Sequence, residues 1–322
     1  MLKKGVKIGD IIDIIFPATS GSIQEISAIK KYLQNLGLKP RILLEKKTTP
    51  RKNLNSALSN FSALGRFEQL YQALENPDSK LVWCGRGGYS AGDLLPYLSK
   101  AKAIEQNKML IGFSDFTSIS TFLQQNWNWK TIQAPVLMQL IQNGKLPVNK
   151  KSEKEILDLI FAKGINRKTD FEYGLIALNK TKTKNIKTEI VGGCLSVLSG
   201  HFGGDFQINF ADKILFLEDI EESGEKLDRY FRQIIEVILK TKKKPQAILL
   251  GEFTYGIKDK FFKENVETAI QNLIARIDEF KLEIPVFQSQ DALGHSDKMR
   301  PLILGVKSEI NSKNQLIIPK IF

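Results

Sequence analysis

The sequence predicts an α/β protein with two domains. In the first half, short apolar runs alternate with amphipathic segments, which is the mark of an α/β sheet. The same pattern resumes after a lysine-rich stretch in the middle of the chain. With 322 residues, of which 42% are hydrophobic, the chain can bury two modest cores, and two domains are the usual arrangement at this length.

The first half opens with a strand and two helices. Residues 10–16 (DIIDIIF) form the strand, which Pro17 closes. The first helix follows a turn at 20–22 and ends at Gly37, with one face made by residues three and four apart: Ile23, Ile26, Ile29, Leu33 and Leu36. The second helix has the same spacing and stops at the turn 76–78; its apolar residues are Leu64, Phe67, Leu70 and Leu74.

Two further strands of the first half each run into a loop that contains glycine. Residues 81–84 lead into Gly85-Arg86-Gly87-Gly88, and residues 109–111 lead into Gly112-Phe113-Ser114-Asp115. A helix over 117–125 is predicted after the second loop. These two loops are the first candidates for chemistry.

The lysine-rich stretch over 151–184 is weakly periodic. It predicts a crossing segment between an N-terminal domain over 1–150 and a C-terminal domain over 185–322. In the second half, we predict strands at 214–217, 247–250, near Val286 and at 302–304, and helices through 227–238 and 266–277. The last two strands flank the loop Gly294-His295-Ser296-Asp297.

The formal charge of +12 favours acidic partners. The lysines come as short runs without interleaved aromatic residues or a nucleic-acid-binding motif, so we interpret them as solvated loops. Cys84 and Cys194, the only cysteines, give neither a disulfide framework nor enough ligands for zinc. With no apolar run of about 18 residues and no signal peptide at the start, we expect a cytoplasmic protein, or a periplasmic one if a signal peptide was removed.

Ser114 is the strongest candidate for a nucleophile. A strand that runs into a sharp turn and then a helix presents the side chain of the turn over the sheet edge, and the amide of Asp115 could then bind an oxyanion. Gly112 suits such a strained turn. The alternative interpretation is that Ser114 caps the helix that follows.

Arg86 is a candidate for binding a carboxylate. The glycines around it let the backbone approach a ligand closely, and the guanidinium can hold a carboxylate with two hydrogen bonds. The alternatives are an ordinary strand-to-helix turn, in which Arg86 pairs with Asp93 or Asp115, and a phosphate-binding loop. The loop lacks the Gly-Lys-Ser/Thr ending of a P-loop and the full dinucleotide spacing.

Only two histidines are present, His201 and His295, which leaves few candidates for a general base and no metalloprotease motif. His295 lies in a polar loop between strands, whereas His201 follows an apolar segment, where packing is the expected role. Glu218 follows a strand and could emerge at a sheet edge; the alternative is a cap of the next loop. The order of Ser114, Glu218 and His295 fits a nucleophile, an orienting carboxylate and a base.

Five ordered blocks of sequence resemble the LD-carboxypeptidase family of serine peptidases, which also includes microcin C immunity peptidases. The blocks are Gly85-Arg86-Gly87-Gly88-Tyr89 with 93–98, Ile111-Gly112-Phe113-Ser114-Asp115, Gly192-Gly193-Cys194-Leu195-Ser196, Leu215-Phe216-Leu217-Glu218-Asp219, and Gly294-His295. Gly9-Asp10 and residues 17–20, near the start of the chain, also resemble this family. The likeness covers nearly the whole chain outside the lysine-rich segment.

This resemblance implies a Ser114–Glu218–His295 triad, with an oxyanion hole made by the amides of Asp115 and Gly88. It also implies a flavodoxin-like N-terminal domain, a smaller α/β C-terminal domain, a homodimer and no cofactor. The family releases the terminal D-alanine from murein (peptidoglycan) tetrapeptides, which predicts a role in murein recycling. Cys194 and Ser90 stand where the family often has Asn and Gly. The alternatives are a microcin-immunity-like peptidase that cleaves a peptidyl nucleotide, and a non-catalytic murein-binding protein.

Overall fold

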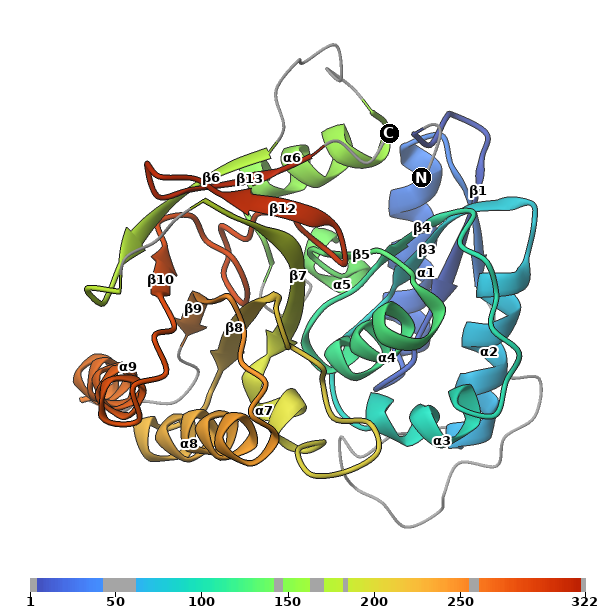
Figure 1. Ribbon diagram of the computed structural model, residues 1–322. Coiled ribbons are helices and arrows are strands. Elements are labelled where there is room, and N and C mark those ends of the chain that lie inside the picture. The colour runs from blue at the N-terminus through green and yellow to red at the C-terminus, as the bar shows by residue number, and fades with distance from the viewer. Residues whose placement is uncertain are drawn as a thin grey trace. The chain divides into compact units, whose positions relative to one another are not determined.

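A computed structural model describes residues 5–42, 62–141, 147–162, 171–181, 185–254 and 261–319 (Figure 1). The chain forms two compact units. The first comprises residues 1–168, 297–302 and 321–322, and the second comprises residues 169–296 and 303–320. Each unit combines a sheet with helices, so the predicted α/β class is confirmed.

The first unit is built on a parallel sheet. The strand order is β11-β5-β4-β3-β1-β2, and the pairs among β1 to β5 are all parallel. β11 begins with Leu302, the last residue of the unit's segment 297–302. The strands are β1 (Ile11–Ile15), β2 (Lys39–Ile42), β3 (Ser79–Cys84), β4 (Met109–Ile111), β5 (Thr131–Gln133) and β11 (Leu302–Leu304).

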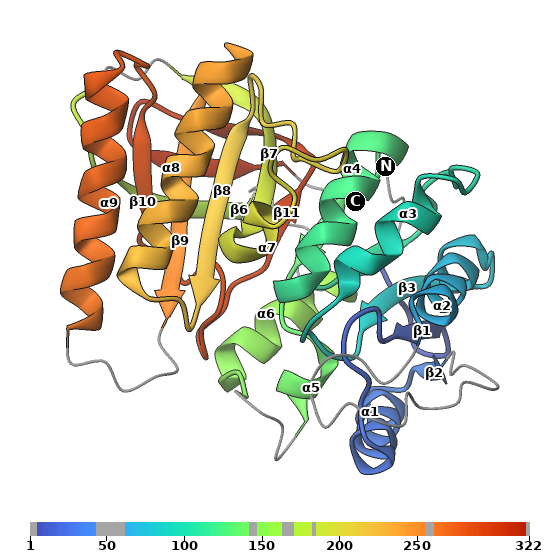
Figure 2. The ribbon, with the colours of Figure 1, turned by 90° about the horizontal axis from the view of Figure 1, so that it is seen from below.

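Helices cover this sheet; Figure 2 shows α3 and α4 on one side of the strands and α1 and α5 on the other. The α-helices are α1 (Ile23–Asn35), α2 (Ala63–Glu75), α3 (Leu95–Leu98), α4 (Thr117–Trp127), α5 (Leu137–Leu140) and α6 (Lys150–Ile160), and the 3-10 helices are η1 (Ala91–Leu94) and η2 (Ser114–Phe116). α1 starts where the sequence predicts, because Ser22 and Glu25 form a capping box. Its buried face includes Ile29 and Leu33.

The second unit is built on a closed barrel with the strand order β10-β6-β13-β12-β7-β8-β9. β7, β8, β9 and β10 pair in parallel, whereas β6, β12 and β13 join them by antiparallel pairing. The strands are β6 (Phe171–Ala177), β7 (Ile186–Cys194), β8 (Ile214–Ile220), β9 (Ala247–Thr254), β10 (Val286–Ser289), β12 (Lys307–Ile310) and β13 (Gln315–Ile318). The sequence predicted an α/β domain here and did not predict a barrel.

Two long helices cover one side of the parallel part of the barrel (Figure 2). They are α8 (Gly224–Thr241) and α9 (Phe262–Glu279); a short helix, α7 (Leu195–Ser199), follows β7. Their apolar faces share one core with the strands, which includes Phe231, Ile235, Leu250, Leu273 and Ile277. This core fixes the strands, and therefore their carboxyl ends.

The segment 151–184, for which the sequence predicted only a crossing, contains most of α6 and all of β6. α6 buries Ile156, Leu159 and Ile160, but its lysines mask this spacing in the sequence. Residues 163–170 and 182–184 of the segment lie outside the described residues.

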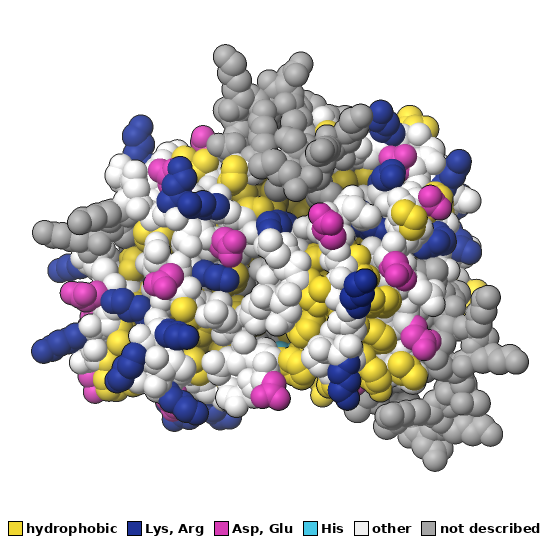
Figure 3. Space-filling view, turned by 45° about the vertical axis from the view of Figure 1, so that its right-hand side comes forward, with side chains coloured by type: hydrophobic (Ala, Val, Ile, Leu, Met, Phe, Trp, Pro, Cys, Tyr) yellow, Lys and Arg dark blue, Asp and Glu magenta, His cyan; other side chains and the backbone are white. Residues whose placement is uncertain are grey.

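Charged side chains are mixed on the face shown in Figure 3, where Lys and Arg side chains lie among Asp and Glu rather than in one basic patch. Within the described residues, no helix is both long and apolar enough to span a membrane.

Candidate active site

Ser114 lies at the end of β4 in a strained turn. Its backbone is left-handed, with a φ of 62°, a conformation that is uncommon for residues other than glycine and clusters at functional sites. The N-cap of α4 is Phe116, and it makes no side-chain hydrogen bond to the helix. The interpretation of Ser114 as the cap of this helix is therefore wrong, and its side chain is partly buried.

The glycine loop after β3 passes directly beside this turn. A Cβ atom placed on Gly87 would lie 3.1 Å from Cβ and 3.2 Å from Oγ of Ser114. Gly88 has a φ of 126°, and a Cβ atom there would overlap the hydroxyl of Thr19. Only glycine fits at both positions without displacement, so the backbone of this loop can approach a group bound at Ser114.

Asp115 and Arg66 tie the loops of the first unit together. The Asp115 carboxylate accepts a hydrogen bond from the backbone N–H of Ala91 at 2.7 Å, and burial raises the pKa of Asp115 to about 6. Arg66, which is almost fully buried, donates to the carbonyl oxygens of Pro17 (2.6 Å) and Ser90 (2.8 Å). The loops after β1, β3 and β4 therefore form one connected edge at the carboxyl ends of parallel strands, where α/β sheets bind ligands.

Arg86 lies in this glycine loop, with a side chain that is 29% exposed. It faces Glu25, at 3.7 Å from Nη1 to Oε2. The predicted alternative partners, Asp93 and Asp115, contact Arg66 and Ala91 instead. Arg86 therefore has an ion-pair partner within its own unit, as the structural interpretation expects. The partner is Glu25, the carboxylate of the α1 capping box, rather than Asp93 or Asp115.

In the second unit, Glu218 at the end of β8 holds His295. The distance from Oε2 of Glu218 to Nδ1 of His295 is 2.6 Å, and the same oxygen accepts the backbone N–H of His295 at 3.0 Å. Both side chains are buried. Thr254, at the end of β9, donates its hydroxyl to the His295 carbonyl at 2.7 Å. The loop before His295 needs Gly294, because a Cβ atom there would lie 2.7 Å from the Glu218 side chain.

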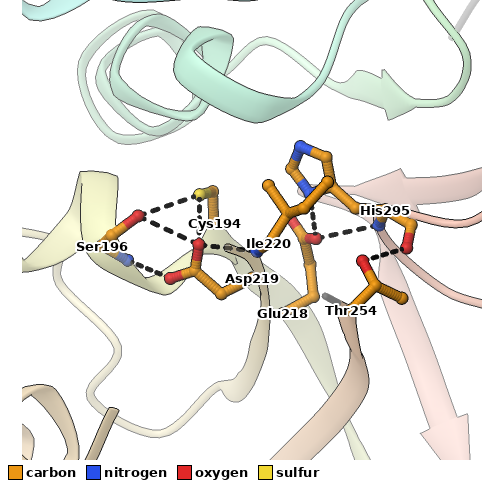
Figure 4. A network of polar contacts seen from close by, with 7 residues as sticks. All are labelled: Cys194, Ser196, Glu218, Asp219, Ile220, Thr254 and His295. Carbon is orange, nitrogen blue, oxygen red and sulfur yellow. Dashed lines mark hydrogen bonds and ion pairs between the residues drawn. The ribbon is translucent and has the colours of Figure 1, made fainter. Parts of the chain in front are cut away.

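The charge of His295 is set by two opposing effects. Burial disfavours the imidazolium, but the charge and hydrogen bond of Glu218, with smaller contributions from Asp219 and Glu221, outweigh it and hold the pKa of His295 above its ordinary value. Because Nδ1 contacts Glu218, Nε2 is the ring nitrogen that would exchange a proton with another group. In Figure 4 this second ring nitrogen points away from Glu218.

A second polar network lies on the other side of Glu218 (Figure 4). The Asp219 carboxylate accepts hydrogen bonds from the backbone N–H of Ser196 (2.6 Å), the Ser196 hydroxyl (3.0 Å) and the Cys194 thiol (3.3 Å). Burial, and next the charge of Glu218, raise the pKa of Asp219 to about 6.

Comparison with known proteins decides the family. A model of the LD-carboxypeptidase N-terminal domain matches residues 12–134, and a model of the LD-carboxypeptidase C-terminal domain matches residues 187–310. The chain belongs to the LD-carboxypeptidase family. The resemblance read from the sequence is therefore confirmed.

Named members of the family share about a third or less of their residues with this chain. A carboxypeptidase-like protein of Rickettsia prowazekii is 30% identical, over 76% of this chain and 72% of its own. The murein tetrapeptide carboxypeptidase of Pseudomonas aeruginosa is 31% identical over 59% of this chain and 61% of its own. The muramoyltetrapeptide carboxypeptidase of Oxalobacter formigenes has the same fold, with a TM-score of 0.70 at 20% identity, covering 96% of this chain and 99% of its own.

In this member of the LD-carboxypeptidase family, the structure groups the predicted residues in two sets. Ser114, Arg86 and the backbone at Gly88 and Asp115 belong to the first unit, and Glu218 and His295 belong to the second. His201 follows α7 at a partly buried position, and burial lowers its pKa. Among the described residues, no group of three or more His, Cys, Asp or Glu side chains could hold a metal ion.

Sequence reasoning missed the side-chain roles of Arg66, Asp115 and Asp219. Each binds backbone groups of a segment at least 23 residues away in the chain, so no local pattern predicts the contact. The one available signal was the pairing of a candidate residue with a following aspartate, Ser114-Asp115 and Glu218-Asp219.

Proposed function

We propose that this protein is a serine LD-carboxypeptidase that releases the terminal D-alanine from murein tetrapeptides. The observation that carries the proposal is the buried Glu218–His295 contact of 2.6 Å, which favours one tautomer of the ring and supports its basicity. The strained position of Ser114 at a strand end supports its role as nucleophile. The Pseudomonas aeruginosa relative, named as a murein tetrapeptide carboxypeptidase, supports the choice of substrate.

In the proposed reaction, Oγ of Ser114 attacks the carbonyl carbon of the last peptide bond and gives its proton to Nε2 of His295. The tetrahedral intermediate collapses when the C–N bond breaks and His295 gives that proton to the leaving D-alanine amine. Water then attacks the acyl-enzyme, with His295 again as base, and the Ser114 hydroxyl is restored. Glu218 stabilises the imidazolium in both halves and stays ionised.

We further propose that the backbone amides of Gly88 and Asp115 bind the oxyanion of the intermediate. The close approach of the glycine loop to Ser114 supports this role, since fixed backbone donors stabilise developing charge without reorganisation. Arg86, in the same loop, is proposed to bind the free carboxylate of the substrate. Its partial exposure and its long 3.7 Å contact with Glu25 support a side chain that can exchange partners.

The finer features of the proposal rest on the family. We propose that the first unit is flavodoxin-like, because its strands β1 to β5 follow the order 2-1-3-4-5. We also propose a homodimer that acts in murein recycling in the cytoplasm, without a bound cofactor.

A second candidate function is cleavage of a peptidyl nucleotide. The Escherichia coli microcin C7 self-immunity protein MccF is 22% identical over 78% of this chain and 77% of its own. Its wild-type apo structure superimposes with a TM-score of 0.72 at 19% identity and covers 99% of both chains. At this identity the likeness supports a shared fold, so the substrate must be decided by experiment.

Mass spectrometry on defined substrates tests the proposal. The protein and its Ser114→Ala variant are incubated with a free murein tetrapeptide, and separately with a peptidyl nucleotide. We expect D-alanine from the tetrapeptide with the wild type alone. Cleavage of only the nucleotide conjugate would assign the second function. Binding of the tetrapeptide without turnover, unchanged in Ser114→Ala, would identify a non-catalytic murein-binding protein.

A further inference from the structure

Asp219 and Glu218 are neighbours in β8 whose side chains point to different segments of the chain, as Figure 4 shows. Glu218 contacts His295, and Asp219 contacts the corner where β7 ends and α7 begins (Figure 4). In the register of β7 with β8, Cys194 lies opposite Glu218. Through these two adjacent carboxylates, β8 is joined both to the start of α7 and to the loop that carries His295.

The Asp219 carboxylate is buried and its hydrogen-bonding capacity is well satisfied. It is 2% exposed and accepts four hydrogen bonds, from Ser196 N–H and hydroxyl, from the Cys194 thiol and from the backbone N–H of Ile220. A buried carboxylate is costly unless it is hydrogen-bonded, and these four donors offset that cost and hold the carboxylate in one position. At Glu218, β8 also departs from regular pairing: its register with β9 shifts between Leu217 and Asp219.

We propose that Asp219 is a positioning residue that acts through Glu218. It fastens the irregular end of β8 to the start of α7, which fixes the carboxylate that orients His295, and its negative charge supports the imidazolium. The kinetic part of this inference rests on the proposed function, in which His295 is the base. The electrostatic part does not depend on it.

The charges around the two groups determine the expected sign. His295 contacts Glu218 and interacts electrostatically with Asp219 and Glu221, and all three carboxylates favour its protonated form. Asp219 interacts with Glu218 and Cys194, and with Tyr230 from α8. Removal of the Asp219 charge should therefore lower the pKa of His295.

NMR titration of the histidine rings tests this without any substrate. The chain has two histidines, so a His201→Gln background leaves His295 as the one ring to follow. We expect Asp219→Asn to lower the midpoint of His295 by about 0.3 unit or more. The control Glu221→Gln removes an exposed charge, which water screens, and should shift the midpoint less.

The kinetic arm separates positioning from charge. On the murein tetrapeptide, Asp219→Asn should lower kcat by roughly tenfold or more and leave KM within about twofold. A displaced Glu218 should slow the proton transfer through His295 without weakening the binding of the substrate. Glu221→Gln should leave kcat unchanged. If Asp219→Asn does not fold, Ser196→Ala removes one donor from the same carboxylate and should shift the His295 midpoint in the same direction.

A His295 midpoint in Asp219→Asn within about 0.1 unit of the wild type would overturn the proposal, whatever happens to activity. A shifted midpoint with unchanged kcat would also overturn it, because Glu218 would then hold His295 without help. If the wild type shows no turnover of any peptide, the proposed function fails, while the titration still reports whether Asp219 supports the His295 charge.

Discussion

The two units place their candidate residues in the same way but hold them by different means. In each, the residues lie near or after the carboxyl ends of parallel strands, β3 and β4 in one and β8 and β10 in the other. In each, one candidate is followed by a buried aspartate that accepts a backbone N–H from the start of a neighbouring helix. Asp115 binds Ala91, and Asp219 binds Ser196.

The difference lies in what makes each candidate reactive. Ser114 has a left-handed backbone and a glycine loop packed closely against it, so its position is controlled by steric constraints. Glu218 is fully buried in a strand and contacts His295, whose pKa it raises, so its effect on the site is electrostatic. Substitutions in the first unit should therefore act through shape, and those in the second through charge and pH.

The largest expected effect is that of Ser114→Ala. Loss of the nucleophile should lower kcat on the murein tetrapeptide by about four or more orders of magnitude, because the members of a triad act as a unit. The free energy of unfolding should change little, since one partly buried hydroxyl is lost. The matched control Ser99→Ala, at an exposed serine of the same unit, should keep full activity. Activity of Ser114→Ala within tenfold of the wild type would exclude the serine mechanism.

Glu218→Gln should show the electrostatic character of the second unit. We expect kcat to fall by roughly 10²- to 10⁴-fold, because a neutral amide no longer stabilises the imidazolium. Without the carboxylate, burial dominates and the pKa of His295 falls, so the acid limb of kcat/KM moves to lower pH. An acid limb that keeps its wild-type position would separate His295 from the reaction.

The same variant has a signature in stability. A raised pKa means that the folded wild type binds the His295 proton more tightly than the unfolded chain does. This stabilisation is complete below the unfolded pKa and is lost as the pH rises through the folded pKa. In Glu218→Gln it should be absent, which urea unfolding at acid and alkaline pH would measure.

Gly87→Ala tests the steric character of the first unit. The added Cβ atom would lie 3.1–3.2 Å from the Ser114 side chain, closer than normal packing. We expect kcat to fall by about 10²-fold, since a small displacement of a nucleophile is enough, with little loss of folding stability. Gly204→Ala, where the Cβ would meet its nearest atom at an ordinary 3.5 Å, is the control. Equal activity in both variants would show that the turn at Ser114 tolerates displacement.

The sequence predicted some elements of secondary structure well and missed others, and the reason is how much each element depends on distant partners. Strands with continuous apolar runs and helices with a clear apolar face were predicted closely; β4 has the predicted bounds and α4 is two residues longer. The barrel strands β6, β7, β12 and β13 were missed, because each is short or mixes charged and apolar residues, and its identity depends on distant partners. The contact of Glu218 with His295 spans 77 residues, so sequence order suggested it but could not place it.

Asp115→Asn is expected to have a smaller effect, on stability. With a pKa of about 6 in the fold, Asp115 binds its proton more tightly when folded, so wild-type stability decreases as the pH rises from about 4 through 6. The amide carries no charge, and the variant should gain on the wild type by about 2 kcal/mol between pH 4 and pH 8. Asp93→Asn, at an exposed carboxylate, should show a much smaller gain in urea unfolding.

Ser90→Gly is expected to have the smallest effect, and in the stabilising direction. Ser90 has a φ of 81°, and its buried hydroxyl has no hydrogen-bond partner among the described residues. Glycine removes both the backbone strain and the unsatisfied hydroxyl, but it also increases the entropy of the unfolded chain. The balance should be a gain of roughly 0.5–1 kcal/mol. Asn128→Gly is the matched control, because Asn128 is also left-handed (φ 55°) but exposed, so it relieves strain without removing a buried hydroxyl. A larger gain for Ser90→Gly than for Asn128→Gly would assign the difference to the hydroxyl. A loss of stability in Ser90→Gly would show that the Ser90 side chain contributes packing that outweighs both costs.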